Sequence, residues 1–93
     1  MSGVEIYTGL FCSACDRAKQ LLARKGIDYE EFDVSADAGR RREMMNRTGG
    51  RMSVPQVFIG GVHAGGYAEL AALERAGQLD SMLGAAKRGT GAG

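Results

Sequence analysis

Residues 9–22, GLFCSACDRAKQLL, place two cysteines three positions apart where an apolar segment passes into a helical pattern. Cys12 and Cys15 are the only cysteines among the 93 residues of the chain. The segment predicts a helix that begins at the cysteine pair, because apolar residues recur behind it at the spacing of one helix face. Gly26 follows where a helix C-terminus favours glycine. The predicted apolar face consists of Ala14, Ala18, Leu21 and Leu22.

This helix lies between two segments that have the pattern of strands. Residues 4–8, VEIYT, alternate apolar and polar side chains, and residues 28–34, DYEEFDV, carry Phe32 and Val34 as apolar positions. A strand, a helix and a strand within about 30 residues form a βαβ unit. We therefore expect two parallel strands joined by a right-handed crossover.

The middle of the chain predicts one more helix and a hairpin. Ser35 is a candidate N-cap for a helix over about residues 37–48, which has a thin apolar stripe. Residues 54–66 read as two short strands joined at Gly60-Gly61, a dipeptide that two-residue hairpin turns favour. The stripe of the helix consists of Ala38, Met44 and Met45.

Two further helices complete the pattern, each marked by apolar residues at helical spacing. The tail from Lys87, KRGTGAG, is rich in glycine and is expected to be disordered. We therefore expect one domain over residues 1–86, a tail over residues 87–93, and the α/β order β-α-β-α-β-β-α-α. The apolar positions are Leu70, Leu73 and Ala76 in the third helix and Leu79, Met82, Leu83 and Ala86 in the fourth.

Composition and charge argue against several classes of protein. Twelve basic and eleven acidic residues leave a net charge of +1, which does not favour a nucleic acid or an anionic membrane as partner. The densest basic run, residues 40–42, reads as a solvated helix face. No segment approaches the roughly 18 apolar residues of a membrane span, and the first residues lack the pattern of a signal peptide. We expect a cytoplasmic protein, in which thiols are reduced by default.

A CxxC pair can be a structural staple, a metal site or a redox centre. A bridge over so short a loop constrains the unfolded chain little, which disfavours the staple. A closed zinc site takes four ligands, whereas the two cysteines and His63 supply at most three. His63 is interpreted as a half-buried structural histidine. An iron–sulfur cluster within one chain also lacks thiolates, although a cluster shared between two chains stays open.

Redox chemistry suits the position of the pair at a helix start. The N–H groups and dipole there stabilise a thiolate, and such surroundings lower a cysteine pKa from about 8.5 to between about 3.5 and 7.5. The helical spacing brings the two α-carbons within disulfide range, roughly 4.4 to 6.8 Å. We expect Cys12 to be the exposed nucleophile and Cys15 the more buried partner that resolves a mixed disulfide. A CxxC near a βαβ unit is typical of thioredoxin-like redox proteins.

Three segments together resemble a bacterial glutaredoxin of the small dithiol class: IYTGLFCSACDRAKQLL, SVPQVFIGGVHAGG and YAELAALERAGQLDSML. The resemblance covers about residues 3–84. It implies a thioredoxin-like fold, with a four-stranded mixed sheet flanked by helices, and a cis peptide bond before Pro55 beside the cysteines. It also implies a monomeric, glutathione-dependent thiol–disulfide oxidoreductase. Its partners would be glutathione, as reductant, and glutathionylated or disulfide-containing proteins.

The resemblance further implies where glutathione binds. The backbone of Val54 would contact the cysteinyl portion, and the start of the third helix would contact the γ-glutamyl end. Small residues at a helix N-terminus suit a carboxylate, although Gly65-Gly66 also fits a simple tight turn. Arg17 or Arg51 would supply a cation for the glycyl carboxylate. The expected contacts are Arg17, Ser53, Val54, Pro55, Gly66, Tyr67 and Ala68.

The chain departs from the family pattern at several positions. Ser13 and Ala14 replace the proline and tyrosine of the common Cys-Pro-Tyr-Cys centre, which removes a ring that covers the glutathione sulfur. The lysine that many relatives carry ahead of the motif is missing, and Ala68 stands where relatives often have an acidic residue. Asp16 would oppose a thiolate nearby.

One departure also favours the alternative function. In the family, centres without the proline are associated with a [2Fe–2S] cluster that bridges two chains. Ser13 is such a case. The cluster would be held by Cys12 of each chain and two glutathiones, and no other metal site is expected. Redox catalysis and cluster carriage share Cys12 and the glutathione site, so the sequence does not separate them.

Overall fold

The computed structural model describes residues 3–92, and side chains are described as far as residue 85. The eight elements follow one another in the predicted order β-α-β-α-β-β-α-α. They are β1 (Val4–Thr8), α1 (Ser13–Arg24), β2 (Glu30–Asp33), α2 (Ala38–Arg47), β3 (Gln56–Ile59), β4 (Val62–Gly65), α3 (Tyr67–Arg75) and α4 (Gln78–Ala92).

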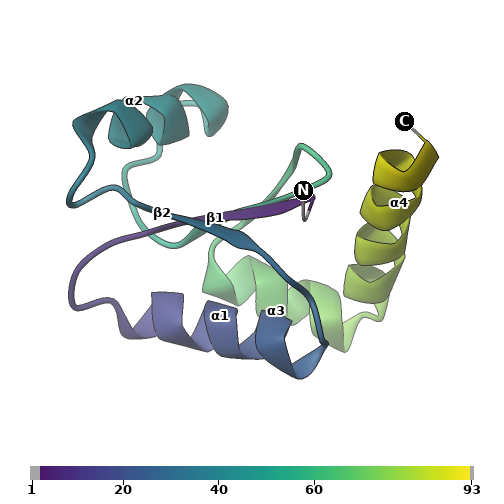
Figure 1. Ribbon diagram of the computed structural model, residues 1–93. Helices are drawn as coiled ribbons and strands as arrows, with labels where there is room; N and C mark the ends of the chain where they lie inside the picture. Colours follow the sequence, from purple (N-terminus) through teal and green to yellow (C-terminus); the bar gives the residue numbers. More distant parts are fainter. Residues whose placement is uncertain (1–2, 93) are drawn as a thin grey trace.

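The four strands form one mixed sheet in the order β2-β1-β3-β4. β1 pairs in parallel with β2, as the βαβ pattern predicts, and β3 runs antiparallel to both β1 and β4. The hairpin turns at Gly60 and Gly61, which both have positive φ. Figure 1 shows α1 and α3 on one face of the sheet, α2 on the opposite face and α4 beside α3. The four-stranded mixed sheet that the family resemblance implies is therefore confirmed.

Two apolar clusters, one on each face of the sheet, form the core. Neighbouring strand residues point to opposite faces, so Ile6 enters the cluster under α1 and α3 while Tyr7 enters the one under α2. The first cluster consists of Val4, Ile6, Ala18, Leu21, Leu22, Val57, Ile59, Ala64, Leu70, Leu79 and Leu83. The second, the α2 cluster, consists of Tyr7, Val34, Met44 and Phe58. Burial in these clusters fixes the register of β1 and β3, which carry the site loops at their ends.

The start of α2 differs from the prediction. Asp37, not Ser35, is the N-cap, and its Oδ1 accepts a hydrogen bond from the Arg40 N–H at 3.1 Å. Ser35 instead lies in a turn, where its N–H donates to Asp33 and its Oγ accepts from the Leu10 N–H. Serine and aspartate are equally good caps, so the composition alone did not separate the two positions. Ala38, expected in the apolar stripe, is exposed.

The last helix reaches almost to the end of the chain. α4 continues to Ala92, and it includes residues from Lys87 onward, where the glycine content favours a disordered tail; residue 93 lies outside the described residues. Once the first turns of a helix have formed, each further residue adds a hydrogen bond at small cost, so weak helix formers still extend it. The expected division into residues 1–86 and 87–93 falls within α4 and stays a prediction.

Candidate active site

The CxxC pair lies at the junction of the loop after β1 and the first turn of α1. Cys12 is the N-cap, and its Sγ accepts a hydrogen bond from the Cys15 N–H at 3.0 Å. The two residues form a disulfide with their α-carbons 5.2 Å apart, inside the range predicted from the spacing. Cys15 is only 2% exposed, whereas Cys12 is half-buried. Cys12 is therefore the more accessible of the two cysteines.

The loop before β3 meets the cysteines from the other side. The carbonyl oxygen of Val54 lies 3.7 Å from the Cys12 Sγ, and the Val54–Pro55 peptide bond is cis, as expected from the resemblance. A side chain at Gly9 would lie 3.2 Å from both a methyl group of Val54 and the Oγ of Ser35. Loops from β1, β2 and β3 therefore converge at the cysteines, and this close approach suits the glycine at position 9.

The start of α3 lies next to the same loop. A Cβ on Gly66 would be 3.3 Å from the Pro55 carbonyl oxygen, which shows how closely the two segments approach. The Gly66 N–H donates to the Glu69 side chain, and Nη2 of Arg51 lies 3.7 Å from Glu69 Oε1. A carboxylate thus already sits at this helix start, with an arginine beside it.

The structure brings most of the predicted glutathione residues together. Val54 and Pro55 lie beside Cys12, and Gly66 lies against Pro55, as described above. Tyr67 and Ala68 open α3, half-buried and exposed respectively. Arg17 is exposed on α1, whereas Arg51 is the cation placed at the α3 start.

Sequence reasoning missed two polar residues of this region. Gln56 is fully buried at the first position of β3, and the signal for it is a polar residue directly after Pro55 in an otherwise apolar strand. Glu69 accepts from Gly66 at the N-cap of α3. Its signal is an acidic residue three positions after a helix start, which is the pattern of a capping box.

Exposed apolar side chains border the cysteines. Phe11 is fully exposed directly before Cys12, and it is the one non-glycine residue with positive φ, +52°, in the described part of the chain. Leu10, on the same loop, and Met52, two residues before Val54, are also largely exposed. A bulky residue with positive φ is unusual and occurs most often at functional sites.

Ionisable groups with shifted pKa values lie around the α2 cluster. Burial raises the pKa of Tyr7, and a hydrogen bond to Glu43 raises it further. The same bond, Tyr7 Oη donating to Glu43 at 2.6 Å, is the main reason that the pKa of Glu43 is lowered. These groups connect β1 to α2 and support the strand that leads to the cysteine loop.

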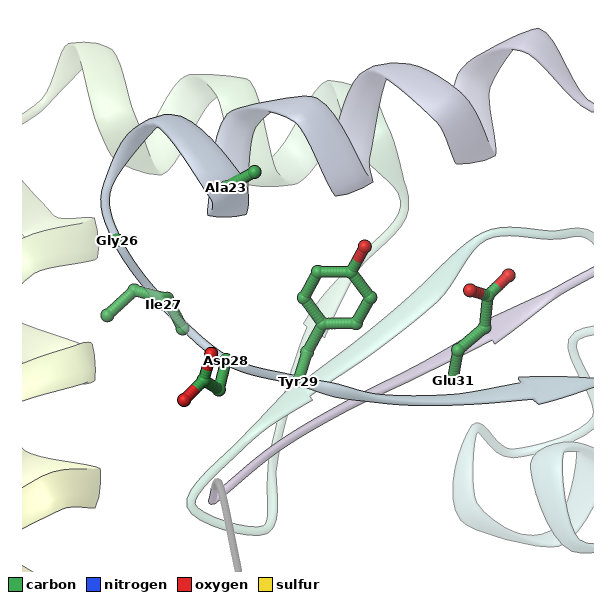
Figure 2. Close-up of a pocket in the computed structure, with 6 residues that line it drawn as sticks. All are labelled: Ala23, Gly26, Ile27, Asp28, Tyr29 and Glu31. Carbon is green, nitrogen blue, oxygen red and sulfur yellow. The ribbon is translucent and has the colours of Figure 1, made fainter.

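An open hollow lies at the far end of α1 from the cysteines (Figure 2). The Glu31 carboxylate is already engaged there, because Thr8 and Lys19 both donate to it. Because it lies at the opposite end of α1 from the cysteines, the hollow is separate from the candidate active site. Its lining residues are Ala23, Gly26, Ile27, Asp28, Tyr29 and Glu31.

Within the described part of the chain, no cluster of three or more His, Cys, Asp or Glu side chains is placed to bind a metal.

The sequence model of the glutaredoxin family matches residues 4–64, which include the cysteines, the cis proline and the hairpin. The chain belongs to the glutaredoxin family. It is 46% identical to glutaredoxin 3 of Escherichia coli K12 over 83 residues, 89% of this chain and 99% of that protein.

Solved glutaredoxin structures agree with this assignment. The solution structure of glutaredoxin from Brucella melitensis is 53% identical, with a TM-score of 0.76 over 89% of each chain. The crystal structure of a buckwheat glutaredoxin–glutathione complex is 28% identical, with a TM-score of 0.81 over 91% of this chain and 79% of that one. The fold is therefore the thioredoxin-like fold that the sequence predicts.

Membership and geometry together give the activity. The protein is a dithiol glutaredoxin, a glutathione-dependent thiol–disulfide oxidoreductase, and its CxxC centre is the Cys12–Cys15 pair. Among the described residues, no helix has the length and apolar character needed to cross a membrane.

Proposed function

We propose that Cys12 is the nucleophile and Cys15 the resolving thiol. The difference in their exposure supports these roles, since an attacking thiolate must reach a bulky disulfide. The Cys15 N–H donates to the Cys12 Sγ at 3.0 Å, and a thiolate at this position would accept the same bond. A charge-assisted hydrogen bond at a helix N-terminus stabilises the thiolate, which is the reactive form.

The monothiol route then needs two exchanges. The Cys12 thiolate attacks the glutathione sulfur of a protein–glutathione disulfide, and the protein thiolate leaves and takes a proton from water. A second glutathione, as thiolate, attacks the glutathione sulfur on Cys12. This step releases oxidised glutathione and restores the Cys12 thiolate.

The dithiol route uses Cys15. After Cys12 has attacked a protein disulfide, the Cys15 thiolate attacks the Cys12 sulfur of the mixed disulfide and releases the protein thiol. The product is the Cys12–Cys15 disulfide seen in this structure. One glutathione opens this bond at Cys12, and a second removes the resulting adduct as oxidised glutathione.

Glutathione is proposed to lie between the loop before β3 and the start of α3. The Val54 carbonyl oxygen is 3.7 Å from the Cys12 Sγ, which suits a backbone contact with the cysteinyl portion; Ser53 and Pro55 flank it. The γ-glutamyl carboxylate would approach Gly66, Tyr67 and Ala68 at the helix N-terminus, which favours anions. The resemblance assigns Arg17 or Arg51 to the glycyl carboxylate. Because Arg51 pairs with Glu69 at this helix start, we instead place Arg51 at the γ-glutamyl carboxylate.

The substrates are proposed to be glutathionylated and disulfide-containing proteins of the cytoplasm, and the enzyme is proposed to act as a monomer. The iron–sulfur carrier left open by the sequence gains no support from a particular contact. A bridging cluster would use the reduced Cys12 thiolate, the same form that the monothiol route uses.

Deglutathionylation of a glutathionylated peptide tests the roles. The assay uses glutathione, glutathione reductase and NADPH with wild type, Cys12→Ser and Cys15→Ser. We expect no activity from Cys12→Ser and retained activity from Cys15→Ser, because the monothiol route does not use Cys15. An active Cys12→Ser would overturn the assignment. An inactive wild type that purifies brown under anaerobic conditions would support the cluster carrier instead.

The same assay separates the two candidate cations. Arg51→Gln and Arg17→Gln each remove one positive charge. The first charge lies beside Glu69 and the second at an exposed position of α1. We expect Arg51→Gln to raise KM for the glutathionylated peptide and Arg17→Gln to leave it unchanged. The reverse result would move the cation site to α1.

A further inference from the structure

Gln56 is a fully buried polar residue whose side chain connects two segments of the protein. Its Nε2 lies 3.0 Å from the carbonyl oxygen of Ser53 and 3.2 Å from the Ser53 Oγ. Its Oε1 lies 2.6 Å from Nε2 of His63 on β4. The residue is 0% exposed, so each of these bonds replaces a bond to water that folding removed.

The Ser53 carbonyl fixes the direction of the hydrogen bonds that link Ser53, Gln56 and His63. A carbonyl oxygen only accepts, so the Gln56 atom next to it is the amide nitrogen. The Gln56 oxygen therefore faces His63 and must accept a hydrogen bond from it. His63 consequently carries its proton on Nε2, and the donors run from His63 through Gln56 to Ser53.

His63 is itself held in place. Its ring stacks on Phe58 with the centroids 4.9 Å apart. Burial is the main cause that lowers the pKa of His63; Arg51 and Arg47 lower it further and Glu69 opposes them. The Nε2–H group donates in both the neutral and the cationic form, so the bond to Gln56 does not depend on the charge of His63.

We infer that Gln56 and His63 are positioning residues that hold the Ser53–Val54 segment in place to receive glutathione. This inference rests on the proposed function, because Val54 is the proposed backbone contact beside Cys12. Ser53 directly precedes Val54, and both Ser53 hydrogen bonds come from one buried side chain. Loss of the Gln56 amide, or of the His63 donor that orients it, would leave the segment less ordered before glutathione arrives.

Two matched substitutions at His63 test the inference. The amide nitrogen of glutamine can take the position of His Nε2, whereas that of asparagine takes the position of Nδ1. His63→Gln therefore keeps the donor toward Gln56 and His63→Asn removes it. We expect His63→Asn and Gln56→Leu to raise KM for a glutathionylated peptide about fivefold to tenfold, with kcat within about twofold of wild type. His63→Gln should have the KM of wild type.

A general loss of structure would not give this result, because it would affect the two His63 variants alike and would lower kcat as well. Equal KM values in wild type, His63→Asn and Gln56→Leu would overturn the inference. Nitrogen-15 NMR of wild-type His63 gives a test that needs no variant. We expect a proton on Nε2, and a neutral ring protonated only on Nδ1 would overturn the proposed hydrogen bond from His63 to Gln56.

A binding experiment separates this inference from the proposed function. S-methylglutathione cannot form a disulfide, and it should shift the Val54 amide resonance of wild type. No shift at Val54 would overturn the proposed glutathione site and the inference with it. A shift in wild type, together with the same affinity in His63→Asn, would overturn the positioning role alone.

Discussion

The guanidinium carbon of Arg47 lies 3.9 Å from the centre of the Phe58 ring. The same side chain donates to the Tyr7 hydroxyl at 2.8 Å and to the Glu5 carboxylate at 2.9 Å. Arg47 thus connects the last turn of α2 to β1 and β3. The contacts combine a cation–π interaction with two hydrogen bonds, one of them to a charged partner.

Replacement of Arg47 by leucine should lower the free energy of unfolding by about 2 kcal/mol, because it leaves Tyr7 and Glu5 without this donor. Arg47→Lys should lie between wild type and Arg47→Leu. Lysine keeps the charge but lacks the planar fork that reaches both partners. Urea unfolding of the three proteins measures the difference, and equal midpoints for wild type and Arg47→Leu would contradict the prediction.

The Glu43 carboxylate predicts a dependence of stability on acid. Its pKa is lowered in the folded protein, first by the Tyr7 hydrogen bond and then by Arg40. A lowered folded pKa gives stability that is present above the ordinary value of 4.5 and is lost as the pH falls through the folded pKa. Stability should therefore decrease on acidification below about pH 4.5, and Glu43→Gln should decrease less steeply.

Tyr7→Phe provides the control for this assignment. It removes the hydroxyl that is the main cause of the shift and keeps the ring in the α2 cluster. Urea unfolding between pH 3 and 6, roughly the titration range of a carboxyl group, should give a shallower slope for both variants. Slopes equal to that of wild type would show that other carboxylates carry the acid dependence.

The sequence was sufficient to predict the elements because their signals are local. The positions of Cys12, Gly26 and the Gly60-Gly61 turn all follow from caps, turn residues and periodicity within a few residues. The α-carbon separation of the cysteines also follows from helical spacing alone. These features do not depend on which distant segments come together.

The contacts that complete the site depend on such distant segments. Ser35 accepts from Leu10 across 25 positions, and Arg47 reaches Glu5 across 42. The hydrogen bond between His63 and Gln56 could not be predicted from the sequence either, because a register irregularity between Val57 and Phe58 alters the pairing of β3 with β4. Periodicity predicts which face a side chain occupies, and it does not predict such shifts in register.

We expect Glu69 to stabilise the folded protein but to weaken the binding of the glutathionylated substrate. Glu69→Ala removes the acceptor for the Gly66 N–H, which should lower the free energy of unfolding by about 1 kcal/mol. Glu69→Gln can keep this cap, since glutamine also occupies the position in capping boxes. Both variants free Arg51 from its ion pair, so KM for the glutathionylated peptide should fall about twofold to fivefold. Unchanged KM values would place the γ-glutamyl carboxylate elsewhere.

Gly65 and Gly77 form a matched pair for the cost of a side chain. Both have positive φ, +104° and +73°, but a Cβ on Gly65 would lie 2.8 Å from the Glu69 Cβ, whereas Gly77 has open space around it. Gly77→Ala should lose about 1 to 2 kcal/mol from backbone conformation alone. Gly65→Ala should lose about 1 to 3 kcal/mol more, because Glu69 must also move. Equal losses on urea unfolding would contradict the crowding at Gly65.

Phe11 is expected to reduce the stability of the protein. Its φ of +52° is unfavourable for a bulky residue, and its side chain is fully exposed and so gains nothing from burial. Asparagine tolerates this conformation better, so Phe11→Asn should raise the free energy of unfolding by about 1 kcal/mol. Leu10→Asn is the control, because Leu10 is also exposed but does not have positive φ. It should leave stability unchanged, and an equal gain in both variants would show that the removal of exposed apolar surface, rather than backbone strain, is responsible.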